Sequence, residues 1–527
     1  MGRGQELLNL VKSIKQEKSM EACEKMLDSI ESMEDYTNTT ATVNDIKKGK
    51  IAYAAGKRIV GEMPPYNVEI NTEADESESF NVLNNLQTIY TTDIDTSKYT
   101  SFSKAFQNLT SLKELKGQLN TDNVTTLENA FDGCANLNKI SFSDTKKVTN
   151  WAKTFQNCNS LEKIENLDMS GATDITYAFN GCKKLKSIPK LTKSFNSYNY
   201  TFSDCEELEE IPISDTTIKD GTNAVAAFKG MKKIKTAPIV NIPRQNVNRS
   251  SMFSGCESLE SVTVASTGGY AFTDVSVSAM FQNCKNLKEI PAGFNNLTLN
   301  GGCSYMFAGC TSLKTAPKMA ANGTYSSIAS MFEGCTNLES VELFTVSCNS
   351  TNNTSFQNIF KNCTNLKDIT ISGSSYGINS WFENCKSLTY IPEGLLVNGF
   401  PQSYGVRAFA GSGITELPEG LFQGMSLSGS NSRRPDWTGL FADCKQLQHI
   451  PVLPMTFSWS NGMADMFKGC DALTDESLNN LMASFMPNTS AGYKNLRFYG
   501  ISQEQAERCK TLSNYQAFLD AGWTTGY

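Results

Sequence analysis

The sequence predicts an α/β protein built as a solenoid of stacked repeats. A Phe-x-x-Cys-x-x-Leu-x-x-Ile pattern returns about every two dozen residues between residues 131 and 470, as in repeat architectures. Twelve of the sixteen cysteines occupy the same position of this pattern. A single coil cannot cover its own apolar side, so neighbouring coils must stack to bury a continuous core.

The repeat unit is well defined along most of this region. Complete copies run from Phe131-Cys134-Leu137-Ile140 to Phe467-Cys470-Leu473, and degenerate copies lie at Phe106-Leu109-Leu112, Phe228-Met231-Ile234 and Phe409-Ser412. Together they predict about fifteen coils across residues 101–474. The expected core includes Phe131, Cys134, Phe155, Cys158, Phe179, Cys182, Phe281, Cys284, Phe307, Cys310, Phe332, Cys335, Phe360 and Cys363.

Each coil is expected to contain two short elements. The segment ending in Phe-x-x-Cys predicts a short helical turn on one side, and the Leu-x-x-Ile segment predicts a strand of one parallel sheet on the other. Proline follows many of these strands and keeps them short, because it lacks an amide donor. Residues that flank the isoleucine position should point outward, among them Lys139, Lys163, Ser187, Glu210, Ser261, Glu289, Ser340, Asp368, Tyr390 and His449.

The N-terminal region differs from the repeats. Residues 1–36 carry two apolar stripes at helical spacing, and so short a helical pair must dock on its own chain, on identical copies or on a larger particle. Residues 37–65 predict a small hairpin, with Gly56 supplying the positive φ of the turn between 51–53 and 58–60. Residues 66–100 are expected to form an acidic linker and an N-terminal cap.

The repeat pattern ends near Thr474. Apolar residues from Leu478 to Phe485 follow helical spacing, 495–499 could form a last strand, and Ser502 is placed to cap a further helix. Residues 475–527 are therefore expected to form a small α/β cap that covers the last coil, as solenoids require.

Composition and chemistry exclude several classes of function. A net charge of -7 and a pI near 5.2 argue against a nucleic-acid partner, and no stretch reaches the roughly 18 apolar residues of a membrane span. His449 is the only histidine, so we expect no catalytic site, no metal site, no cofactor and no enzymatic activity. The repeated cysteines are expected to be reduced and buried; structural disulfides are the alternative.

The repeat unit resembles that of the BspA-like leucine-rich-repeat family. The resemblance rests on the Phe-x-Gly/Asn-Cys-x-x-Leu-x-x-Ile-Pro unit and on spacers such as residues 144–149, and it covers most of the chain. It implies a leucine-rich-repeat solenoid. Members of this family serve as bacterial surface adhesins and also occur in phage genes.

Both flanking regions resemble segments of phage proteins. Residues 41–61 are similar to a short module of tail and virion-surface proteins of phages of Gram-positive bacteria, and residues 473–527 are similar to the end of repeat proteins encoded with phage tail genes. The first resemblance implies an anchoring module that comprises Asp45, Ile46, Gly49, Tyr53, Gly56 and Gly61. It also implies that the N-terminal region binds other virion proteins.

These resemblances imply a phage structural protein, a tail or baseplate appendage. Its repeats would bind a host surface glycan or protein, and homo-oligomeric copies on one particle would raise the avidity. The expected location is the virion surface, reached from the host cytoplasm because the N-terminus shows no signal peptide. A head decoration or structural spacer on the virion is one alternative, and a bacterial cell-surface adhesin is another.

Overall fold

The computed structural model describes most of the repeat region and the C-terminus. The described residues are 51–54, 57–60, 87–91, 96–97, 99–213, 217–218, 221–241, 247–265, 276–294, 298–299, 302–322, 327–347, 353–375, 377–396, 404–424, 436–455, 457, 461–488 and 491–526. The chain divides into two compact units, Met1–Leu191 and Thr192–Tyr527. The predicted array 101–474 thus spans two units, and the other predicted domain boundaries remain predictions.

The first unit contains a hairpin and a parallel sheet. β1 (Ile51–Ala54) pairs with β2 (Lys57–Val60) in antiparallel register, which confirms the predicted hairpin. The sheet has the order β3-β4-β5-β6. Its strands are β3 (Thr88–Tyr90), β4 (Glu114–Lys116), β5 (Lys139–Ser141) and β6 (Lys163–Glu165). All its strand pairs are parallel, one strand from each coil, as the repeat pattern predicts.

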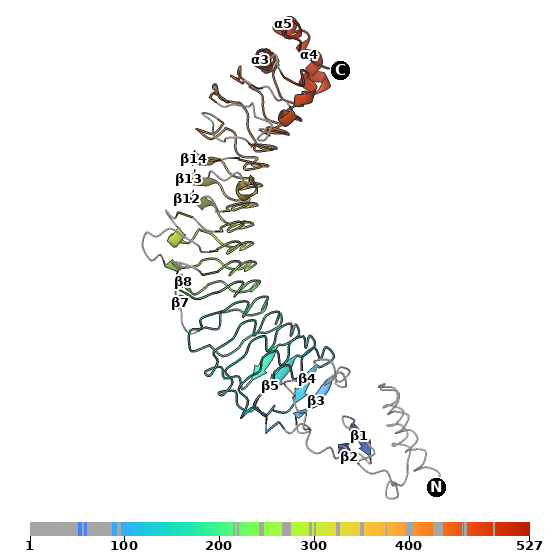
Figure 1. Ribbon diagram of the computed structural model, residues 1–527, viewed down its shortest axis with the longest axis vertical. Coiled ribbons are helices and arrows are strands. Elements are labelled where there is room, and N and C mark those ends of the chain that lie inside the picture. Colours follow the sequence, from blue (N-terminus) through green and yellow to red (C-terminus); the bar gives the residue numbers. More distant parts are fainter. Residues whose placement is uncertain are drawn as a thin grey trace, which may run out of the picture. The chain divides into compact units, whose positions relative to one another are not determined.

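The second unit holds two further parallel sheets, so the single sheet predicted along the repeats is not formed. The coil that ends in Ile188 and Pro189 contributes no strand, because proline lacks the amide donor that a strand ladder requires. The order β7-β8-β9 comprises β7 (Thr217–Ile218), β8 (Ile239–Asn241) and β9 (Val264–Ala265). The other contains β10 (Thr298–Leu299), β11 (Thr315–Ala316), β12 (Met319–Asn322), β13 (Ser340–Ser347) and β14 (Asp368–Ser374). Figure 1 shows β12, β13 and β14 side by side, in agreement with their parallel registers. Short 3-10 helices lie at Ala292–Phe294, Asn353–Phe356 and Asn461–Met463.

The Phe-x-x-Cys segments are turns, so the prediction of short helical turns is wrong. In one such segment Asn129 and Gly133 have φ values of 54° and 78°, in the left-handed region that an α-helix does not use. The amides of Asn129, Phe131 and Gly133 donate to carbonyls of the next coil, whereas those of Ala130 and Asp132 donate to carbonyls three residues back in the same coil. Alternation of these bonds leaves no run of i to i−4 bonds, and the architecture is a leucine-rich-repeat β-solenoid.

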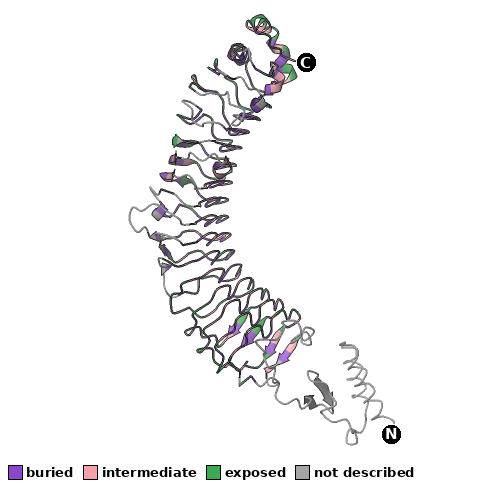
Figure 2. Ribbon diagram, viewed as in Figure 1, coloured by how far each residue is buried: buried purple, intermediate pink, exposed green. Residues whose placement is uncertain are grey.

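The interior is filled by the repeated apolar residues. Every phenylalanine and cysteine predicted for the core is fully buried, and Figure 2 shows buried segments along the inside of the coils. Phenylalanine rings of successive coils stack at 5.0 to 5.8 Å from Phe106 to Phe179 in the first unit. In the second unit they stack at 5.2 to 6.1 Å from Phe202 to Phe467. These separations suit offset aromatic stacking.

The C-terminal cap is helical. It contains α3 (Asp475–Phe485), the 3-10 helix η6 (Leu496–Tyr499), α4 (Gln503–Cys509) and α5 (Tyr515–Asp520). Ser502 caps α4 as predicted, in a capping box with Gln505, and the Gln505 side chain donates to the Cys470 carbonyl at 2.7 Å. This bond ties the cap to the last coil.

The strand predicted at 495–499 is not formed. The Asn495 side chain accepts a hydrogen bond from the Arg497 amide and so caps η6, which left-handed Gly500 ends. Only an isolated bridge between Asn495 and Thr524 remains of the predicted strand. The expected α/β cap is therefore a helical one.

Candidate binding surface

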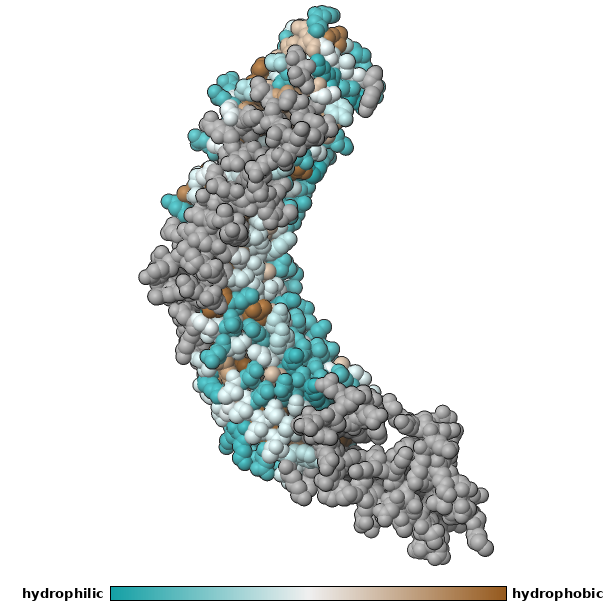
Figure 3. Space-filling view, in the orientation of Figure 1, coloured by the Kyte–Doolittle hydropathy of each residue, from teal (hydrophilic) through white to brown (hydrophobic). Residues whose placement is uncertain are grey.

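The residues that flank the isoleucine position form a row of outward side chains in each unit. Nine of the ten side chains predicted to point outward are exposed, and Ser340 is half-buried. The strands hold these positions in line, because each coil donates backbone hydrogen bonds to its neighbour; Gln448, for example, donates to the Thr415 carbonyl at 2.9 Å. Hydrophilic residues cover most of the described surface in Figure 3. We call the row of side chains that flank the isoleucine position the strand face.

Charges on the surface are compensated from one coil to the next. In the position after the repeat leucine, a lysine of one coil meets a glutamate of the preceding coil; the pairs are Lys186–Glu162, Lys288–Glu260 and Lys367–Glu339, at 3.0, 2.5 and 3.7 Å. The position after the cysteine repeats the arrangement in Lys232–Glu206 and Lys285–Glu257, at 2.6 and 3.0 Å. The hydrogen bond from Lys288 lowers the pKa of Glu260. Such exposed pairs each contribute little to stability.

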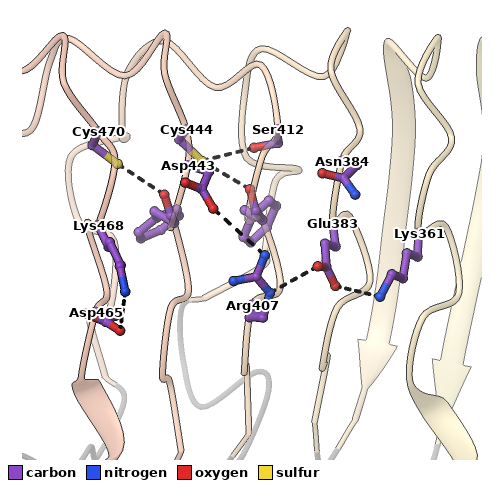
Figure 4. A network of polar contacts seen from close by, with 12 residues as sticks. Lys361, Glu383, Asn384, Arg407, Ser412, Asp443, Cys444, Asp465, Lys468 and Cys470 are labelled. Atoms are coloured by element: carbon purple, nitrogen blue, oxygen red, sulfur yellow. Dashed lines mark hydrogen bonds and ion pairs between the residues drawn. The ribbon is translucent and has the colours of Figure 1, made fainter. Parts of the chain in front are cut away.

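A more buried network joins four coils at the edge formed by the Phe-x-x-Cys turns (Figure 4). Glu383 accepts hydrogen bonds from Lys361 and Arg407, each at 3.0 Å, and Arg407 lies 4.0 Å from Asp443. Burial acts to raise the pKa of Glu383, but hydrogen bonds from Lys361, Ser380 and Arg407 outweigh it and hold the pKa below its ordinary value. The carboxylate is therefore charged at neutral pH and links its neighbours.

The buried thiols form a ladder of hydrogen bonds that sequence reasoning missed. Cys335 Sγ donates to the Phe307 carbonyl of the preceding coil at 3.1 Å, and the same bond recurs in other coils of both units, at 2.9 to 3.2 Å. Burial raises the pKa of the Cys134 and Cys335 thiols to about 12. Burial keeps these two thiols protonated, and the whole ladder lies in the interior, so it supports the fold and leaves chemistry to the exterior.

The residue two positions after the phenylalanine recurs in the sequence, but its backbone role was missed. Gly, Asn or Asp recurs there, and the structure places these residues in the left-handed region. At Gly309 a Cβ atom would lie 2.3 Å from the Asn283 Oδ1 of the preceding coil. Glycine at position 309 is thus a packing requirement of this coil.

Of the predicted anchoring residues, Tyr53 alone lies within the described part of the chain. Tyr53 lies in β1, where it pairs with Arg58. Asp45, Ile46, Gly49, Gly56 and Gly61 lie outside the described residues, as does the predicted N-terminal helix. The anchoring role remains a prediction.

The described residues hold neither a metal-binding cluster nor a membrane-spanning helix. No group of three or more His, Cys, Asp or Glu side chains in the described ranges is placed to hold a metal ion. In the same part of the chain, every helix is too short or too polar to span a lipid bilayer.

Comparison with family models identifies the repeats. Residues 152–288 and 278–415 match the BspA type leucine rich repeat region, in six copies that together span half of the chain. The chain belongs to the BspA-type leucine-rich repeat family. Residues 74–193 also match a model described as a Mycoplasma protein of unknown function. Repeat proteins of the BspA type are typically non-enzymatic binding proteins.

Solved structures of bacterial leucine-rich repeat proteins resemble this BspA-type chain at low identity. A protein from Bacteroides ovatus is 20% identical, with 70% of this chain and 79% of that chain covered and a TM-score of 0.37. A leucine rich cell surface protein from Faecalibacterium prausnitzii is 19% identical, with 74% and 87% covered and a TM-score of 0.32. A protein from Eubacterium ventriosum is 17% identical, with 59% and 85% covered and a TM-score of 0.29. At these TM-scores the likenesses carry no argument about function.

No curated protein matches the chain. The family match supports a solenoid of about nine turns. The larger count of about fifteen coils is part of the proposal below.

Proposed function

We propose that this BspA-type protein is a non-enzymatic binding protein that presents its strand face at a bacterial cell surface, in the manner of an adhesin. The observation that carries the proposal is the division of roles in every described coil. The repeated Phe and Cys side chains are buried in the interior, whereas the strand face varies in charge and size from coil to coil. Variation on a constant scaffold is typical of binding surfaces on solenoids.

Each phenylalanine repeat, of which there are about fifteen, would form one coil of the same array. A long row of weak contacts can bind a surface tightly when several coils or several copies engage at once. The N-terminal region, docked on partner proteins or on copies of the chain, would supply the anchor. The strand face would bind a glycan or a protein.

A phage virion protein is the second candidate. The observation in its favour is the β1–β2 hairpin, which forms where residues 41–61 resemble a virion module. The matches named above include no phage protein, so this reading rests on the two flanking segments. We rank it below the cell-surface adhesin.

Immunogold labelling tests the location. Antibodies against residues 247–526 should label the outer envelope of intact cells that make the protein. Label confined to phage particles would support the virion candidate instead, and label confined to the cytoplasm would contradict both. A second assay would measure binding of the purified chain to cells by flow cytometry, with the same chain unfolded by heat as the control.

A further inference from the structure

The ladder of compensated charges ends in the last coils of the array. Up to Lys367, the position after the repeat leucine alternates Glu and Lys in the pairs described above. In the next three coils the same position holds Thr389, Thr415 and Gln448, all exposed and uncharged.

Backbone bonds place these three coils side by side. The Thr415 amide donates to the Thr389 carbonyl at 3.2 Å, and the Gln448 amide donates to the Thr415 carbonyl at 2.9 Å. Further along the same coils, the Phe422 amide donates to the Leu396 carbonyl at 2.7 Å. The register therefore aligns Tyr390, Glu416 and His449 in one column.

The same register aligns a second column, which consists of Glu393, Glu419 and Val452. All three of its residues are exposed, Val452 at 54%, and each follows a proline of its own coil. Tyr390 in the first column is 39% exposed, and its hydroxyl oxygen accepts a hydrogen bond from the Ile369 amide, which fixes the ring against the sheet.

The carboxylates of this region differ in their pairing from those of the preceding coils. Within the described residues, no ion pair or side-chain hydrogen bond involves Glu393, Glu416 or Glu419, whereas glutamates on the preceding coils are paired with lysines. Three uncompensated negative charges thus lie in two adjacent coils beside exposed apolar side chains. A sheet face of this composition is complementary to an extended segment that alternates apolar and basic residues.

We propose that the face formed by Tyr390, Glu393, Glu416, Glu419 and Val452 binds a cationic, extended protein segment. Lysine or arginine side chains of the segment pair with the three carboxylates, and its apolar residues pack on Tyr390 and Val452. The partner class is a basic protein and not a neutral glycan, because charge dominates this face and only one aromatic ring on it is exposed. This inference rests on the proposed binding function and names its partner class.

The test uses the full chain and a fluorescein-labelled peptide of six Val-Lys repeats. Binding is measured by fluorescence anisotropy at low and high NaCl. The test variant carries E393Q, E416Q and E419Q. The matched control carries E257Q, E260Q and E339Q, which removes the same charge from glutamates that lysines already compensate.

We expect the unmodified chain to bind the peptide and to lose at least about tenfold in affinity at high salt, as charge pairing requires. The test variant should lose about tenfold in affinity at low salt, since each lost ion pair weakens binding by about two- to fivefold. The control should stay within about twofold of the unmodified chain, and Tyr390→Ala should weaken binding without changing its salt dependence.

Equal losses in the test and control variants would overturn the inference, because net charge would then suffice. Absence of peptide binding would overturn it too, as would binding of neutral dextran that Tyr390→Ala abolishes and the triple variant retains. Cell binding by the unmodified chain, measured in parallel, reports on the proposed function by itself. If the chain binds cells but not the peptide, only the inference fails.

Discussion

At the scale of single residues, the coil is specified by what its backbone needs at two positions. The left-handed residue two positions after each phenylalanine lets alternate amides face the next coil. The cysteine that follows is small enough to be buried and can donate to a carbonyl of the preceding coil. Sequence alone showed that both positions recur, but their bonding partners lie in another coil and required the structure.

Replacement of Gly309 separates backbone strain from steric contact. Gly309→Ala adds a Cβ atom 2.3 Å from Asn283 Oδ1, whereas Gly394→Ala meets nothing within 4 Å at a similar positive φ. Left-handed strain costs about 1 kcal/mol in both variants, so the free energy of unfolding should fall by about 2 to 3 kcal/mol for Gly309→Ala. Chemical denaturation measures the free energy of unfolding of both variants. Adding Asn283→Gly to Gly309→Ala should restore part of the lost stability. Equal losses in the two alanine variants would refute the contact.

The thiol ladder predicts a loss of stability at high pH. Burial raises the pKa of Cys134 and Cys335 to about 12, while an unfolded cysteine titrates near 8.5. The folded state therefore retains protons that the unfolded state loses. The stabilisation is complete below about pH 8.5 and declines as the pH rises toward about 12, by about 1.4 kcal/mol per thiol and pH unit.

Melting temperatures between pH 8 and pH 11 measure this decline. A variant with Cys310 and Cys335 both replaced by Ala serves as the control, since tyrosines and lysines also titrate in this range. Its melting temperature should be lower at pH 8 but should fall by less between pH 8 and pH 11. An identical pH dependence in the two proteins would show that the thiols are not responsible.

At the scale of elements, several strands and the cap helices were predictable, whereas the turns and the absence of a strand at 495–499 were not. The Leu-x-x-Ile spacing predicted β5 and β6 because strand periodicity is local, and Ser502 predicted the start of α4 because capping needs only neighbouring residues. The Phe-x-x-Cys turns were mistaken for helical turns, because alternate amides donate to the next coil and not to a carbonyl of the same segment. The network around Glu383 was equally invisible, because it joins residues of four coils.

Loss of the Glu383 charge should weaken the packing of these coils. Glu383→Gln leaves Lys361 and Arg407 without their carboxylate, and we expect the free energy of unfolding to fall by about 2 kcal/mol at pH 7. Glu257→Gln, which breaks an exposed pair with Lys285, should cost under about 0.5 kcal/mol. Urea denaturation compares the two.

The pH dependence of the Glu383 contribution has a defined sign. Because the pKa of the folded carboxyl is lowered, its stabilisation is present above the unfolded pKa of about 4.3 and is lost as the pH falls through the lower folded pKa. The difference in stability between Glu383→Gln and the unmodified chain should therefore shrink below about pH 4. A difference that is independent of pH would contradict the charged network.

At the scale of the whole molecule, each unit has an apolar interior and a polar, variable exterior. This arrangement follows from the repeats, because the interior positions recur with little change. The strand face, in contrast, changes from paired lysines and glutamates to the unpaired carboxylates near Glu416. Fold and interior followed from the repeat pattern. The partner did not, because binding specificity depends on combinations of exposed side chains that only stacking brings together.

The central claim is that the repeated cysteines are reduced interior side chains of stacked coils. Mass spectrometry after N-ethylmaleimide treatment tests it directly, on the native chain and on the chain unfolded in guanidinium without reductant. The account predicts that the ladder cysteines stay unlabelled in the native protein and all react once it is unfolded. Rapid labelling of native ladder cysteines, or cysteines that react in guanidinium only after reduction, would contradict it.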